Sequence, residues 1–125
     1  MNNKVKIAVD AMGGENAPRK IIKGINISLK KNRENYFYLF GNKDLINDEI
    51  NNDKLLRANS EIIDTKSVIS DNESPLAAAK KGKESSMWKA IEFLKNKKAD
   101  ITLSAGNTGA MLVISRLLLN TIPGI

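Results

Sequence analysis

The residues best suited to chemistry form a run of small and hydroxylic side chains at positions 104–110. The run follows a strand-like stretch, 99–103, and precedes a helix-like stretch from Met111 to Leu119. Such a strand-to-helix turn leaves backbone N–H groups uncovered, and the dipole of the following helix favours an anion there. The turn holds no Lys, Arg, Asp or Glu, so backbone and hydroxyl groups would do the binding. A plain helix cap with glycines for tight turning fits the residues equally well.

Each residue of this turn has an expected role. We predict that Gly106, Thr108 and Gly109 present N–H groups to the anion, beside Ser104. The amide of Asn107 is expected to hydrogen-bond either the anion or the carbonyl oxygen of a second substrate, which makes it a candidate catalytic residue.

A second small-residue turn follows the first expected strand. Asp10 ends that strand, and Gly13 and Gly14 come directly after it. In a parallel sheet both turns lie beyond the carboxyl ends of the strands, so a shared crevice is expected. Asp10 would then orient a neighbouring group or N–H as a second catalytic candidate; a local cap of the turn is the slightly favoured alternative.

The pair Ser85 and Ser86 is a further candidate for anion binding. At least one of the two is expected to cap the next helix, because Ser is a preferred N-cap residue. The other could reach the anion, with Lys83 adding positive charge. The alternative for Lys83 is an ordinary solvated side chain.

Composition excludes several kinds of chemistry. The 125 residues contain no Cys and no His, which excludes disulfides, Cys/His zinc sites, catalytic cysteines and Ser-His-Asp arrangements. We expect no metal. The net charge of +6 comes mostly from scattered lysines, which predicts a solvated surface. Attraction to anionic substrates or membrane lipid is the alternative.

Apolar periodicity predicts strands that alternate with helices. The expected strands are 5–10, 36–40, 61–64 and 99–103. The expected helices are one capped by Asn16 with Pro18 in its first turn, a weak stretch at 44–57 that 51–53 interrupt, a short helix at 76–81 capped by Ser74, one capped by Ser85, and one at 110–119. This order indicates a single α/β unit over residues 1–125, with three αβα layers around a mostly parallel sheet.

Two apolar groups have structural and functional interpretations. Met87, Trp88 and Phe93 are expected in the core rather than in an acyl-binding stripe. The helix at 110–119 is apolar on nearly all sides, which fits either core burial or a subunit interface. It is too short to span a bilayer, and the amino terminus does not resemble a secretory signal, so we expect a cytoplasmic protein.

Three motifs in register resemble the bacterial phosphate acyltransferases of phospholipid synthesis, the PlsX family. They are residues 9–14 followed by Ala17 and Pro18, residues 85–87, and residues 104–110. The resemblance covers essentially the whole chain and implies a Rossmann-like fold of the isopropylmalate dehydrogenase and phosphotransacylase type. Members of the family are two to three times longer, so residues 1–125 are expected to be an amino-terminal part that is inactive alone.

The resemblance implies transfer of a fatty acyl group from acyl carrier protein to inorganic phosphate, giving acyl phosphate. The resemblance implies no organic cofactor. Phosphate is already a nucleophile, so no activated Ser or Cys is required, and the anion needs only to be held beside the thioester carbonyl while the developing oxyanion is stabilised. The resemblance also implies a homodimer in the full-length protein and peripheral association with the inner face of the membrane.

Three other functions stay open. A phosphate acetyl- or butyryltransferase would use a coenzyme A thioester on the same fold class. A basic chain with a G-x-x-G sequence at 106–109 also fits an RNA-binding loop of the KH type, but that loop joins two helices and this one follows a strand, so no nucleic acid is expected. The last alternative is a folded, non-catalytic module.

Overall fold

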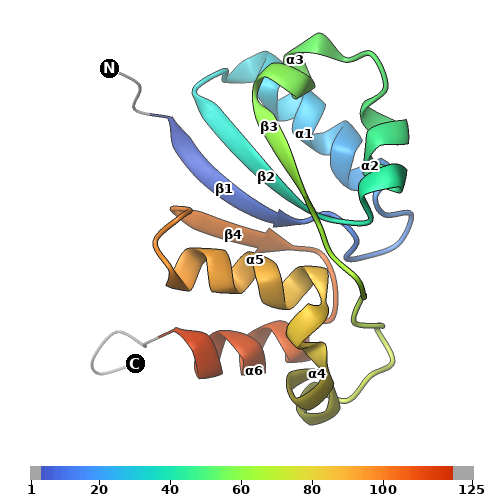
Figure 1. Cartoon of the computed structure of the whole chain (residues 1–125), viewed down its shortest axis with the longest axis vertical. Helices are drawn as coiled ribbons and strands as arrows, with labels where there is room; N and C mark the ends of the chain where they lie inside the picture. The colour runs from blue at the N-terminus through green and yellow to red at the C-terminus, as the bar shows by residue number, and fades with distance from the viewer. Residues whose placement is uncertain (1–3, 120–125) are drawn as a thin grey trace.

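The computed structural model describes residues 4–119, and its centre is a four-stranded parallel sheet (Figure 1). The strands are β1 (Val5–Asp10), β2 (Asn35–Gly41), β3 (Ser60–Asp64) and β4 (Ile101–Ser104). Their order across the sheet is β3-β2-β1-β4, and each neighbouring pair runs parallel. The α/β class and the parallel sheet are confirmed.

Helices fill the connections between these strands, and one more helix, α6, follows β4. They are α1 (Arg19–Lys31), α2 (Lys43–Ile50), α3 (Lys54–Ala58), α4 (Pro75–Lys81), the 3₁₀ turn η1 (Gly82–Glu84), α5 (Ser86–Lys95) and α6 (Thr108–Leu118). The predicted interruption at 51–53 separates α2 from α3. The predicted caps Ser74 and Ser85 accept hydrogen bonds from Ala77 N and Trp88 N.

One cap prediction is wrong. Asn16 does not cap α1, which begins after Pro18 without a side-chain cap. Asn16 instead has a left-handed φ of 60°, and its backbone oxygen accepts from Lys20 N. The backbone of Asn16, and not its side chain, therefore contributes to the start of the helix.

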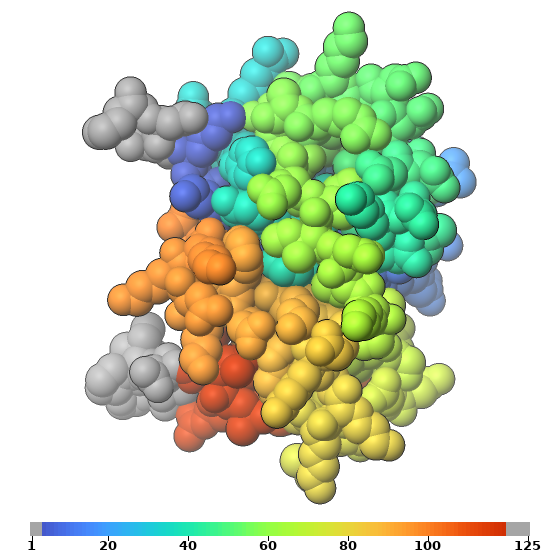
Figure 2. Space-filling view, viewed as in Figure 1, coloured from blue at the N-terminus to red at the C-terminus, as the bar shows by residue number. Residues whose placement is uncertain are grey.

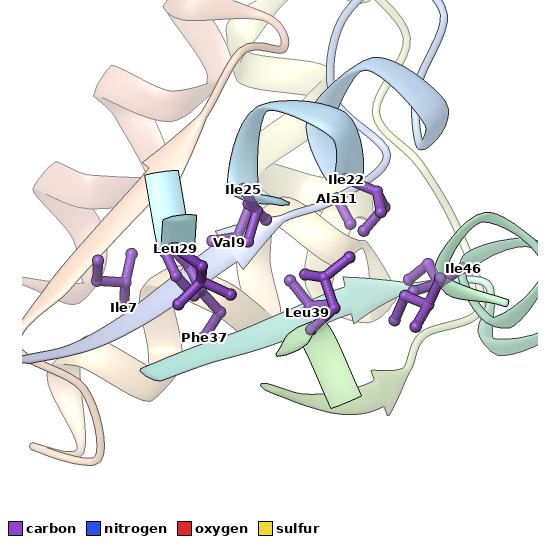
Figure 3. Packing of buried hydrophobic residues seen from close by; sticks show 11 residues of the cluster. Ile7, Val9, Ala11, Ile22, Ile25, Leu29, Phe37, Leu39 and Ile46 are labelled. Carbon is purple, nitrogen blue, oxygen red and sulfur yellow. The ribbon is translucent and has the colours of Figure 1, made fainter. Parts of the chain in front are cut away.

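The two faces of the sheet bury different helices. Ile22, Ile25 and Leu29 of α1 pack on one face, against Val9 and its neighbours on β1 and β2 (Figure 3). On the other face, Ala90 of α5 packs with residues of β1 and β2 that point away from α1. Strands of a parallel sheet need cover on both faces, which is why β1 and β2 are almost continuously apolar.

Helices α4, α5 and α6 form a second apolar cluster beyond the sheet. Met87 and Trp88 are buried in it, and Phe93 packs partly buried against β2, so the expectation of core positions is confirmed. Helix α6 buries only Ala110 and Ile114; its Leu112 is 72% exposed. The expectation of core burial for α6 therefore holds for one side of the helix.

The chain between β3 and α4 connects the two halves of the molecule. In Figure 2 it crosses, in green to yellow-green, from the sheet and its first helices to the cluster of α4, α5 and α6. Because all strands are parallel, this segment leaves from the same edge of the sheet as the turns after β1 and β4. Within residues 4–119, no helix has the length and apolar character needed to cross a membrane.

Candidate functional site

The turns after β1 and β4 meet at the carboxyl edge of the sheet. A Cβ atom on Gly13 would lie 2.8 Å from Gly106 N and 2.9 Å from Ser104 Oγ. Gly14 has a φ of +93°, and a Cβ atom on it would lie 2.9 Å from Ala105 O. The two turns can approach this far only because glycine lacks a side chain, so the predicted convergence of the two turns is confirmed.

Asp10 is the buried centre of this contact. Its side chain is 2% exposed, and an ionised carboxylate can only accept hydrogen bonds. It accepts from Ser86 Oγ at 2.6 Å, from Ser104 Oγ at 2.8 Å and from Met12 N at 3.1 Å. Asp10 therefore joins β1, the start of α5 and the end of β4, and it combines both predicted roles: local cap and orienting group.

This network revises two predicted phosphate donors. Ser104 must give its only hydroxyl proton to Asp10, and its oxygen accepts Gly106 N at 3.1 Å. Neither Ser104 Oγ–H nor Gly106 N–H is then free to donate to an anion. The two groups shape the turn instead.

The N–H groups of Thr108 and Gly109 have no acceptor within residues 4–119. They are the first two residues of α6, where helical N–H groups lack intrahelical partners and the dipole is positive. A hollow of about 330 Å³ borders Thr108. Its lining is uncharged and consists of Ser104, Gly106, Thr108, Met111, Leu112 and Ser115.

Gly13 and Gly14, in the turn after β1, border a different hollow. Together with Asp10 and Ser104 they border a larger groove that runs along α1. Ser104 borders both hollows, so the crevice that the sequence predicts is divided at this residue.

The side chain of Asn107 is used for positioning. Its Oδ1 accepts Ala110 N at 3.0 Å and so caps α6. Its Nδ2 donates to Ser70 O at 3.1 Å and to Glu73 O at 2.9 Å, which uses both amide hydrogens. This arrangement favours a positioning role over the direct substrate contact that the sequence predicts.

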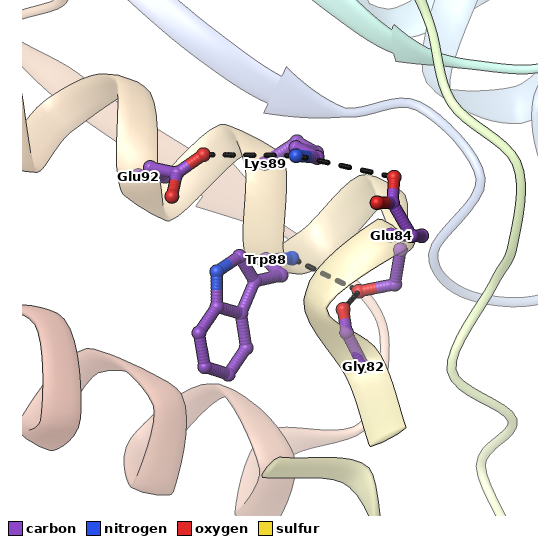
Figure 4. A network of polar contacts seen from close by, with 6 residues as sticks. Gly82, Glu84, Trp88, Lys89 and Glu92 are labelled. Carbon is purple, nitrogen blue, oxygen red and sulfur yellow. Dashed lines mark hydrogen bonds and ion pairs between the residues drawn. The ribbon is translucent and has the colours of Figure 1, made fainter. Parts of the chain in front are cut away.

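Ser85, Ser86 and Lys83 do not gather at the free N–H groups. Ser85 Oγ donates to Gly82 O and accepts Trp88 N, so it caps α5 (Figure 4). Ser86 is fully buried against Asp10. Lys83 lies exposed in η1, and among residues 4–119 no hydrogen bond or ion pair joins it to either turn. The nearest described ion pairs involve Lys89, whose Nζ lies 3.8 Å from Glu92 and 4.0 Å from Glu84.

The amino termini of α5 and α6 differ in whether a carboxylate lies beside them. The carboxylate of Asp10 lies against Ser86 in the first turn of α5, so that helix terminus already faces an anion. The first turn of α6 faces none within the described chain. Away from the turns, burial first, then the charges of Glu61 and Tyr38, raise the pKa of Tyr36 near the amino end of β2. Residues 4–119 hold no group of three His, Cys, Asp or Glu residues placed to bind a metal.

Sequence reasoning missed the contribution of the segment between β3 and α4. Ser67 O accepts Ser86 N at 3.0 Å, while Ser70 O and Glu73 O accept the amide of Asn107. This segment is thereby fixed to the starts of both α5 and α6. Its polar sequence indicates a loop, and nothing in that pattern indicates which helices it joins.

The fold and the turns define a parallel α/β protein in which two strand-to-helix turns meet at the carboxyl edge of the sheet. A family model described as "Fatty acid synthesis protein" matches residues 5–125. The chain belongs to this family.

Named relatives give the same result. The chain is 51% identical over 125 residues to a protein called phosphate acyltransferase from Pelagibacter ubique (strain HTCC1062), covering 100% of this chain and 37% of the relative. It is 43% identical over 126 residues to a phosphate acyltransferase of Rhodopseudomonas palustris (strain BisA53), again over 100% of this chain and 36% of the relative. The chain thus spans little more than a third of the length of these relatives.

Proposed function

We propose that the full-length protein transfers an acyl group from acyl carrier protein to inorganic phosphate. The observation that carries this proposal is the pair of unoccupied N–H groups, Thr108 and Gly109, at the start of α6 in a chain of this family. The names of the relatives support the reaction class, phosphate acyl transfer. The carrier protein as donor is the finer part of the proposal.

The reaction needs no activated side chain. An oxygen of hydrogen phosphate attacks the thioester carbonyl carbon, a C–O bond forms, and the C–S bond breaks. The proton of hydrogen phosphate goes to the leaving thiolate, so acyl phosphate and free carrier thiol are the only products. The protein has to hold the two substrates together and stabilise the oxyanion that develops on the carbonyl oxygen.

The residues of the two turns have different parts in this proposed reaction. The N–H groups of Thr108 and Gly109 hold the phosphate, helped by the dipole of α6. Asp10 positions the turn through Ser104, and Asn107 positions α6 against the 70–73 segment. No Lys or Arg lies within the turn, so charge neutralisation falls to groups elsewhere in the full-length protein.

The test uses a longer protein in which these 125 residues replace the matching part of the Pelagibacter relative. The unaltered relative is the positive control. We expect release of free carrier thiol from acyl carrier protein that depends on phosphate and is accompanied by acyl phosphate.

Two results would contradict the proposal. Turnover with coenzyme A thioesters alone would replace the carrier protein by coenzyme A, as in an acetyl- or butyryltransferase. Thiol release that is independent of phosphate would mean hydrolysis. RNA binding is not part of the proposal, because the G-x-x-G turn here joins β4 to α6 and has no cation within it.

A further inference from the structure

Two adjacent serines at the start of α5 are equally buried but have different hydrogen-bond partners. Ser85 and Ser86 are both 0% exposed. The hydroxyl of Ser85 donates to Gly82 O at 2.6 Å and accepts Trp88 N at 3.1 Å, so both partners lie three positions away. The hydroxyl of Ser86 donates to Asp10 Oδ1 at 2.6 Å, across 76 positions of sequence. Of the two serines, Ser86 is therefore the one whose side chain is joined to the centre of the turns.

The Ser86 hydroxyl fixes the orientation of the Asp10 carboxylate. A hydroxyl that donates to a carboxylate at this distance makes a charge-assisted hydrogen bond, about twice as strong as a neutral one. The backbone of Ser86 is itself held, because its N–H donates to Ser67 O at 3.0 Å. Without the hydroxyl, Asp10 Oδ1 would keep Met12 N, at 3.1 Å, as its remaining partner among residues 4–119.

The orientation of Asp10 is passed on to the turn after β4. Its other oxygen, Oδ2, accepts Ser104 Oγ at 2.8 Å, and Ser104 Oγ accepts Gly106 N at 3.1 Å. A rotation of the carboxylate therefore moves the acceptor that holds Gly106. The next residue, Asn107, is the N-cap of α6, and the two residues after it carry the N–H groups without a described acceptor. A displacement of about 1 Å in a binding group is enough to weaken its function strongly.

We propose that Ser86 is a positioning residue, which fixes Asp10 and thereby the turn that presents the first N–H groups of α6 to phosphate. Ser86 does not touch phosphate, because its hydroxyl is buried and gives its proton to Asp10. The effect on phosphate rests on the proposed function, whereas the effect on the turn does not. The two effects can therefore be measured separately.

The test compares Ser86→Ala with Ser85→Ala in the longer protein in which these 125 residues replace the matching part of the Pelagibacter relative. Each variant loses one buried hydroxyl, from adjacent positions. Ser86→Cys is a second variant, because a thiol occupies the same place but donates only weakly. Steady-state kinetics give the KM for phosphate and the KM for the acyl carrier protein thioester. Hydrogen exchange of the Gly106 amide is measured without either substrate.

We expect Ser86→Ala and Ser86→Cys to raise the KM for phosphate at least about fivefold, while the KM for the thioester changes less than about twofold. The Gly106 amide should exchange at least about tenfold faster in both variants. Ser85→Ala should change neither the phosphate KM nor the Gly106 exchange rate appreciably, because its lost bonds belong to the cap of α5.

Three results would overturn the proposal. The first is an equal rise of the phosphate KM in Ser86→Ala and Ser85→Ala, or of both KM values in Ser86→Ala, since a general loss of structure would produce it. The second is a Ser86→Cys protein that behaves like the unaltered one, since packing would then replace the hydrogen bond. The third is an unchanged exchange rate of the Gly106 amide in Ser86→Ala.

Failure of the proposed function has a different signature. The unaltered protein would then show no thiol release that depends on phosphate. The exchange rate of the Gly106 amide in Ser86→Ala and Ser85→Ala would still decide whether Ser86 fixes the turn, because this measurement needs no turnover.

Discussion

At the scale of single residues, the close contact of the two turns depends on glycine at position 13. Gly13 has no Cβ, and the position of that atom is 2.7 Å from Asp10 Oδ2 and 2.8 Å from Gly106 N. Those neighbours are backbone or are fixed by hydrogen bonds, so they cannot move away at low cost. The closeness of the two turns is therefore a direct consequence of one residue type.

Gly13→Ala should lower the free energy of unfolding by about 1–3 kcal/mol, because the added methyl group forces the two turns apart. Gly24→Ala in α1 is the matched control: a Cβ there meets nothing within 4 Å, and alanine favours the helix by about 0.5–1 kcal/mol. Urea unfolding of both variants measures the difference. Equal effects would contradict the close packing of the turns.

The buried carboxylate of Asp10 holds two hydroxyl groups. Asp10→Asn replaces one acceptor oxygen by a donor, so we expect a loss of about 1–3 kcal/mol of stability. Combined with Ser104→Ala it should be non-additive by about 0.5–3 kcal/mol, because both changes break the same hydrogen bond. Asp100→Asn is the control, since that exposed carboxylate accepts a single hydrogen bond within residues 4–119, from Lys6 N. Strict additivity in a double-mutant cycle would exclude the network.

At the scale of elements, Asn107 fixes the start of α6 to the segment between β3 and α4. Asn42 is a useful comparison, because it caps α2 through Leu45 N and its side chain makes no other described hydrogen bond. Asp is as good an N-cap as Asn, but it cannot donate. Substitution of Asn107 by Asp therefore keeps the cap of α6 but removes the two hydrogen bonds to the segment between β3 and α4.

Asn107→Asp should cost about 1–3 kcal/mol and increase hydrogen exchange and proteolysis at residues 70–73, while the amide of Ala110 stays protected. Asn42→Asp should change stability by less than about 0.5 kcal/mol. If both variants behaved alike, Asn107 would be an ordinary cap, and its two bonds to the segment would carry no energy.

At the scale of the whole molecule, the sequence predicted the sheet and the meeting of the two turns, because these follow from local apolar runs and from parallel strand direction. It could not predict which acceptors bind the hydroxyl protons of the serines and the amide protons of Asn107. Asp10 and Ser86 are 76 positions apart, and Asn107 is 34 positions from Glu73. Their partners depend on tertiary contacts that no local pattern records. The bond from Gly106 N to Ser104 Oγ spans only two residues, but the Ser104 hydroxyl that accepts it donates its proton to Asp10, 94 positions away.

The central claim is that α6 holds phosphate through its first two N–H groups. The most direct test is backbone amide NMR of the longer protein in which these 125 residues replace the matching part of the Pelagibacter relative. The protein is titrated with phosphate at constant ionic strength. We expect saturable shifts of the Thr108 and Gly109 amides, with Gly106 changing little because it remains bound to Ser104. Unchanged Thr108 and Gly109 signals, with shifts confined to exposed lysine-rich segments, would contradict it.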